Sequence, residues 1–199
     1  MRLLQPVCGN PGSFTMLHTI DLVVEPVTDP RITLVLQALR GMYLNGGVIF
    51  RSIRPNDASA YDSLFANTNL NPSHLIYRFL SHPTLNRELP ELGLPTEIPF
   101  DLPLTFYSGY EYEGALTHAL VSGGAYTSSP FSDGDARTMS KVCVEAMLGG
   151  EMATTTVCRI EGPWAPWFNS SQWDRSFATF NHGQRRWTLL CLTDTKHTA

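Results

Sequence analysis

The sequence has few charged residues and no excess of positive charge. Of its 199 residues 16% are charged, whereas about 25% is usual in globular domains. The formal net charge is -4 and the sequence pI is about 5.8, so a nucleic-acid interface, which needs a basic face, is not expected. No run approaches the ~20 apolar residues of a membrane helix, and the N-terminal residues lack the continuous apolar segment of a signal peptide. We therefore expect a soluble, cytoplasmic protein that binds neither nucleic acid nor membrane.

Cysteine is also scarce. The four cysteines are Cys8, Cys143, Cys158 and Cys191, and no two of them form a Cys-x-x-Cys pair. Four cysteines in 199 residues are too sparse for a disulfide framework. The last three lie within apolar patterns, so we expect buried free thiols. A contact between Cys158 and Cys191 on neighbouring strands stays open.

The common catalytic signatures are missing. The sequence contains no G-x-G-x-x-G, no phosphate-binding P-loop, no H-E-x-x-H and no G-x-S-x-G. The six histidines show no metal-ligand spacing among themselves. We therefore predict no cofactor and no bound metal.

Residues 164–195 organise the remainder of the chain. They begin with an aromatic loop, residues 164–174, which holds three of the four tryptophans. Two strand-like runs follow, at 174–180 and 185–193, joined by an Asn-His-Gly-Gln turn. We expect this hairpin to form the sheet on which the helices pack.

Helical and strand patterns alternate along the rest of the chain. Helices are predicted from Pro30 to the Asn45-Gly46-Gly47 stop and at 58–66, 72–82, 111–121 and 133–148; strands are predicted at 16–24, 48–53 and 152–160. Asp29 and Ser132 are the expected N-caps. Prolines recur every four or five residues through 85–104, so neither a helix nor a central strand is expected there.

These patterns indicate an α+β fold, with a C-terminal antiparallel sheet of three or more strands and helices packed on one face. One domain over residues 1–199 is the default for this length. The alternative is a helical lobe at 29–82 and a sheet-containing lobe at 104–195, joined by the proline-rich segment 85–104.

Glu111, Glu113 and His118 form the first candidate site. Glu111 and His118 are seven residues apart, so they share one face of the predicted helix, with small residues between them. A carboxylate and an imidazole on one face could hold a divalent metal or transfer a proton. Alternatively, the glutamates simply stabilise the first helical turn, where negative charge is favourable by ~0.3–1 kcal/mol.

The aromatic loop is the second candidate site, through the side chains of Trp164, Trp167, Phe168 and Trp173. Exposed aromatic rings could bind a ligand or anchor a protein partner. Alternatively, the loop folds back and buries these rings against the sheet.

Asp174 and Asp194 are the third candidate. They begin one strand of the hairpin and follow the end of the other, which antiparallel pairing brings close together. A pair of carboxylates could bind a metal or act as acid and base. Alternatively, each binds local backbone N–H groups.

Trp173-Asp174 and the run Leu-Cys-Leu-Thr-Asp-Thr at 190–195 resemble the ends of uncharacterised microbial proteins, which close with a Trp-Asp strand and a Leu-Cys-x-Thr-Asp-Thr strand. The resemblance covers about the last third of the chain, from Tyr110 onward. It implies no activity and no catalytic residue.

The leading hypothesis is a soluble binding or protein-interaction module that uses the aromatic loop. The alternative is a small metal-dependent or acid–base hydrolase built on Glu111, Glu113, His118, Asp174 and Asp194. A third hypothesis is a structural subunit of a homodimer, assembled through the sheet edge or the proline-rich segment. A protein partner, a second copy or a small-molecule ligand is compatible with these patterns.

Overall fold

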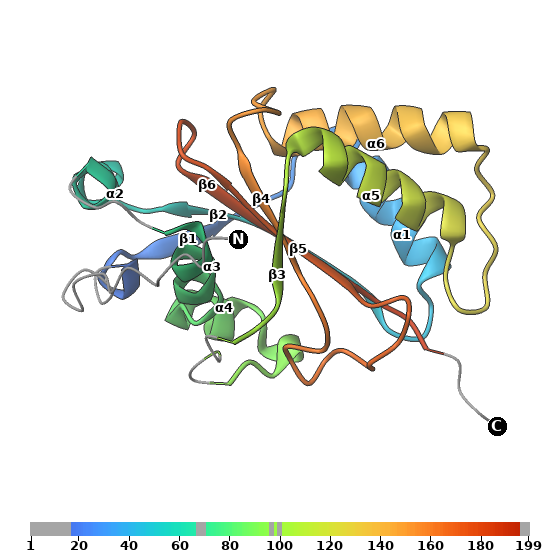
Figure 1. The fold of residues 1–199 in the computed structure, drawn as a ribbon, viewed down its shortest axis with the longest axis horizontal. Helices are drawn as coiled ribbons and strands as arrows, with labels where there is room; N and C mark the ends of the chain where they lie inside the picture. The colour runs from blue at the N-terminus through green and yellow to red at the C-terminus, as the bar shows by residue number, and fades with distance from the viewer. Residues whose placement is uncertain (1–16, 67–70, 96–97, 99–100, 196–199) are drawn as a thin grey trace, which may run out of the picture.

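The computed structural model describes residues 17–66, 71–95, 98 and 101–195, and their fold is α+β, as predicted (Figure 1). In this part of the chain, six strands form one antiparallel sheet in the order β1-β2-β6-β5-β4-β3. The strands are β1 (Leu22–Glu25), β2 (Gly47–Pro55), β3 (Leu104–Tyr107), β4 (Thr156–Ile160), β5 (Arg175–Asn181) and β6 (Arg186–Thr193).

The predicted hairpin, β5 and β6, forms the centre of the sheet. Its register places Arg175 opposite Leu192 and Asn181 opposite Arg186. Beyond their first residues, both strands are buried along their whole length. Since neighbouring residues of a strand face opposite sides, both faces of the sheet must be covered.

Three helices cover one face: α1 (Pro30–Met42), α5 (Gly109–Ser122) and α6 (Asp133–Met147) (Figure 1). Their apolar stripes pack on Phe50, Phe177 and Leu190 of the sheet. α1 contacts both α5 and α6, and β2 pairs with β6. Elements from both candidate lobes therefore share one sheet and the hydrophobic cluster on this face.

A second layer covers the opposite face. It contains α2 (Ala58–Ala66), α3 (Pro72–Leu80), α4 (Pro83–Glu88) and two short 3-10 helices, η2 (Leu17–Thr19) and η3 (Pro90–Leu92). Trp187 is fully buried there, and its ring stacks on Phe79 and Phe180, with centroids 4.4 and 4.3 Å away. Helices do pack on one face of the sheet, as predicted. Because the hairpin is apolar on both sides, a second layer also packs on the other face.

The proline-rich segment is more regular than predicted. Pro90, within the segment, and Pro83, just before it, each begin a helix at its first position, where the missing N–H of proline costs no helical hydrogen bond. Leu85, Leu89 and Leu92 are fully buried against the second layer. The following residues form β3, an unpredicted edge strand that pairs with β4. The segment is therefore part of the core.

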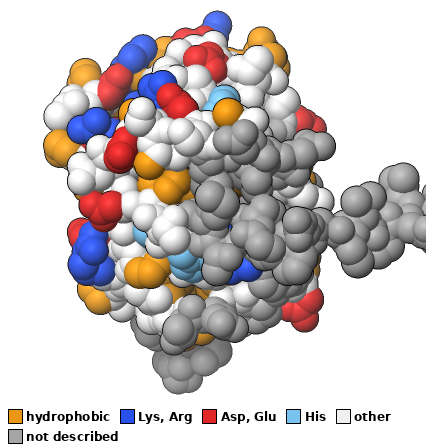
Figure 2. All heavy atoms as spheres, turned by 90° about the vertical axis from the view of Figure 1, so that its left-hand side faces the viewer, with side chains coloured by type: hydrophobic (Ala, Val, Ile, Leu, Met, Phe, Trp, Pro, Cys, Tyr) orange, Lys and Arg blue, Asp and Glu red, His pale blue; other side chains and the backbone are white. Residues whose placement is uncertain are grey.

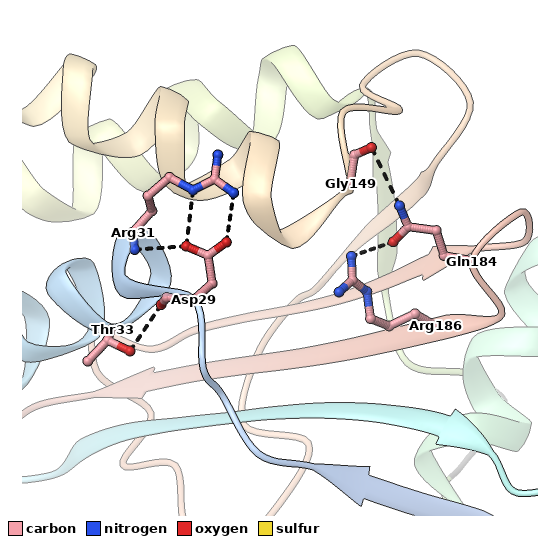
Figure 3. Close-up of polar contacts among 6 residues, drawn as sticks. All are labelled: Asp29, Arg31, Thr33, Gly149, Gln184 and Arg186. Atoms are coloured by element: carbon pink, nitrogen blue, oxygen red, sulfur yellow. Dashed lines mark hydrogen bonds and ion pairs between the residues drawn. The ribbon is translucent and has the colours of Figure 1, made fainter.

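Polar contacts hold the start of α1 and the turn of the hairpin (Figure 3). Asp29 is the N-cap of α1, as predicted, and its carboxylate accepts from the Arg31 backbone N–H at 2.9 Å and from the Arg31 guanidinium. Gln184 in the hairpin turn donates to the Gly149 carbonyl at 3.4 Å and accepts from Arg186. The bond from Gln184 to Gly149 ties the hairpin turn to the residues that follow α6.

The three cysteines within the described ranges are free and buried, as predicted; Cys8 lies outside those ranges. Burial raises the pKa of Cys158 to about 12, which leaves its thiol protonated. Cys158 lies on β4 and Cys191 on β6, with β5 between them. The two residues are therefore not on neighbouring strands.

The side of the molecule that carries α2 mixes charges of both signs. Figure 2 shows basic and acidic side chains interspersed on the described part of this face. Arg185 and Asp62 form a bidentate pair there, with both contacts at 2.7 Å. No helix in the described ranges is both long and apolar enough to cross a membrane.

His82 makes the stability of the second layer depend on pH. Its Nδ1 accepts from the Thr84 N–H, its Nε2 contacts the Ile20 carbonyl at 3.1 Å, and burial lowers its pKa below 6.5. The unfolded chain therefore binds a proton more readily. We expect the free energy of unfolding to fall as pH drops below about 6.5, by up to about 1.4 kcal/mol per pH unit.

His82→Asn removes the ionisable ring and keeps an N-cap acceptor. Urea unfolding between pH 5 and 8 should show a smaller pH slope than the wild type, with a remainder from His18, whose pKa burial also lowers. His182→Asn, in the exposed hairpin turn, is the matched control. An unchanged slope in His82→Asn would contradict this assignment.

Candidate functional site

The aromatic loop packs mainly into the core. Trp164 and Phe168 are 5% and 6% exposed, and their rings lie 5.6 Å apart. The Trp164 indole donates to Ser176 Oγ at 2.8 Å. Trp167 and Trp173 are half-buried, and they pack against opposite faces of the sheet. The loop therefore offers parts of two rings to a partner, not a cluster of four.

Asp194 joins three segments of the fold. Its buried carboxylate accepts the backbone N–H groups of Asn45 at 2.9 Å, Ala125 at 2.7 Å and Thr195 at 3.0 Å. A side chain at Gly124 would collide with this carboxylate and with the carbonyl of Met42. Asp194 therefore holds the loops after α1 and α5 against the end of β6.

Asp174 binds different partners. Its Oδ1 accepts from the Thr193 hydroxyl at 2.6 Å, and its Oδ2 accepts from the Ser171 backbone N–H at 3.0 Å. The hairpin brings Asp174 and Asp194 near each other, as predicted, but their carboxylates serve separate backbone and hydroxyl donors. Each carboxylate is thus already used as an acceptor within the fold, and the paired-carboxylate site stays a prediction.

Glu111 and His118 do line one cavity, of about 560 Å³, between α5 and strands β3 to β5. Ala115 lies between them on the same helical face, as the seven-residue spacing predicts. Phe177, Tyr107 and Gln172 complete its apolar and polar walls. Glu113 points elsewhere and lines a separate hollow beside Lys141 and Glu145. Of the three residues of the first candidate site, Glu111 and His118 therefore line one cavity and Glu113 does not.

Glu111 also caps α5. Ser108 Oγ accepts from the Glu111 N–H at 3.3 Å, and Glu111 Oε2 accepts from the Ser108 N–H at 2.7 Å, which is a capping box. These bonds hold the pKa of Glu111 below its ordinary value of 4.5. The carboxylate is therefore ionised near neutral pH.

The sequence reasoning missed two arginines of this cavity. Arg159 on β4 is opposite Phe177, and Arg175 is two residues before Phe177 on β5, so the arginines occupy diagonal positions on one face. Arg159 is neutralised by Glu161 at 3.1 Å and contacts the Tyr107 hydroxyl at 3.4 Å. Both arginines alternate with apolar residues in predicted strands, which indicates that they lie on the sheet. Only the register of β4 against β5 shows that they lie together.

Arg175 contacts His118. Its guanidinium donates to His118 Nδ1 at 3.1 Å, and Ser122 Oγ lies 3.1 Å from the same nitrogen. Since arginine can only donate, Nδ1 is the acceptor and the ring proton of neutral His118 is on Nε2. Within the described ranges, Arg175 forms no ion pair with a carboxylate. Its positive charge is left for the cavity.

Another cavity, of about 350 Å³, lies near the start of α1. Its two acidic residues, Glu25 and Asp29, are already paired with Arg54 and Arg31, both at 2.7 Å. Among the described residues, no group of three or more histidine, cysteine, aspartate or glutamate side chains could hold a metal ion.

No protein-family model matches the sequence, and no curated protein matches it significantly.

Asp194 should prove structural. In Asp194→Asn, an amide N–H₂ would face a backbone N–H that now donates to the carboxylate, so we expect a loss of roughly 2–4 kcal/mol in the free energy of unfolding. Asp101→Asn, in an exposed turn, should change it by less than about 0.5 kcal/mol. Urea unfolding of both variants measures the difference. A stable Asp194→Asn protein would show that the carboxylate is dispensable to the fold.

Proposed function

We propose that this protein is a binding module for a small anionic ligand, held in the cavity between α5 and strands β3 to β5. The observation that carries the proposal is Arg175. It lines the cavity, and its charge has no acidic partner within the described ranges. A carboxylate or phosphate group is the natural partner of such a guanidinium, because paired N–H groups match two oxygens.

The neighbouring groups support this role. Arg159, the Tyr107 hydroxyl and the Gln172 amide all line the same cavity and can all donate hydrogen bonds. The exposed His118 adds its Nε2–H, because its other nitrogen is occupied by Arg175. A cavity with so many donors favours a ligand rich in acceptor oxygens.

An acid–base hydrolase remains the second candidate, since Glu111 and His118 share this cavity. The capping bonds to Glu111 Oε2 weigh against it, because they stabilise an ionised carboxylate that is a weak base and a poor acid near neutral pH. A homodimer through a sheet edge stays a prediction, with β1 and β3 as the edges concerned.

Arg175→Met keeps the aliphatic stem and removes the charge. We expect it to weaken binding of small anions at least ten-fold, as measured by titration calorimetry with inorganic phosphate, acetate and succinate. Arg40→Met, on the exposed side of α1, is the matched control and should bind as the wild type does. The proposal fails if the wild-type protein binds none of these anions, or if Arg175→Met binds them equally well.

A further inference from the structure

We infer that the anionic group bound at Arg175 belongs to a zwitterion, an ω-amino carboxylate. The inference rests on the proposed anion site at Arg175. What it adds is a second recognition point, Glu111, which lines the same cavity two helical turns before His118, the residue that Arg175 contacts. The cavity therefore has one positive and one negative end.

The negative end is an available acceptor. Both capping bonds from Ser108 go to Oε2 of Glu111. In the described part of the chain, Oε1 receives no hydrogen bond, and the side chain is exposed. Oε1 can thus accept from an ammonium group without breaking the helix cap. A purely anionic ligand would leave this carboxylate unused and would be repelled by it.

The spacing along α5 sets the length of the ligand. Glu111 and His118 are seven residues apart, which is about 10 Å at 1.5 Å per residue. The guanidinium of Arg175 contacts His118, so it marks the positive end. Allowing ~3 Å for a hydrogen bond at each end leaves roughly 4–5 Å between the ligand's charges. An α-amino acid, with a single carbon between its two groups, is too short to meet both ends.

The wall between the two ends suits a methylene chain. Ala115 occupies the helical face between Glu111 and His118, and its methyl group leaves room for a ligand. Phe177 is buried below, and Tyr107 lies beside it with ring centroids 6.3 Å apart. A short aliphatic chain would bury apolar surface here while its charged groups meet Glu111 and Arg175.

The test compares 4-aminobutanoate with butanoate, butylamine and glycine by titration calorimetry, on the full chain. We expect 4-aminobutanoate to bind at least ten-fold more tightly than each of the other three. Glu111→Gln should abolish its advantage over butanoate, while glutamine keeps the capping box. Glu113→Gln, on the same helix but outside this cavity, is the matched control and should preserve the advantage.

The outcomes separate this inference from the proposed function. If butanoate binds as tightly as 4-aminobutanoate, or if Glu111→Gln keeps the preference, the zwitterion inference is overturned and the anion site stands. If neither compound binds and phosphate and succinate also fail, both proposals are overturned. Circular dichroism and thermal unfolding of Glu111→Gln check that a lost preference does not come from a lost fold.

Discussion

The burial of the β5–β6 hairpin on both faces is the constraint on which the rest of the structure depends. A half-exposed antiparallel sheet would alternate apolar and polar residues, whereas these two strands are buried at nearly every position. Two layers are therefore required. α1, α5 and α6 supply one, and α3, α4 and the aromatic loop supply most of the other. The proline-rich segment belongs to this second layer, because its leucines are needed to cover Trp187 and its neighbours.

The candidate site lies at one corner of the sheet, where the helices cease to cover the strands completely. Arg175 is the first residue of β5 and is half-buried, whereas Phe177, two positions further on, is fully covered by the helices. The cavity thus sits where the sheet emerges from beneath α5, so long polar side chains reach solvent while their stems stay against the core. The same layer that protects the hairpin therefore shapes the cavity.

The features that could be predicted from the sequence are those that depend on neighbouring residues along the chain. The hairpin, the Asp29 and Ser132 caps and the shared face of Glu111 and His118 follow from turn residues, cap residues and helical period. The sequence could not predict contacts that depend on register: Arg159 and Arg175 meet only because β4 and β5 pair as they do. Nor could it separate a catalytic aspartate from a structural one, since two of the partners of Asp194 lie in loops 69 and 149 residues away in sequence.

A structural role alone does not explain why Arg175 carries a charge. Its hydrogen bond to His118 anchors α5 to β5, and such a bond contributes only about 0.5–1.5 kcal/mol. A neutral donor such as glutamine could supply a bond of that kind without desolvating an ion. The other arginine of the cavity, Arg159, does have an acidic partner in Glu161. The Arg175 guanidinium beside His118, together with the Glu111 oxygen that is free to accept, is an arrangement that a ligand with opposite charges at its two ends would complement.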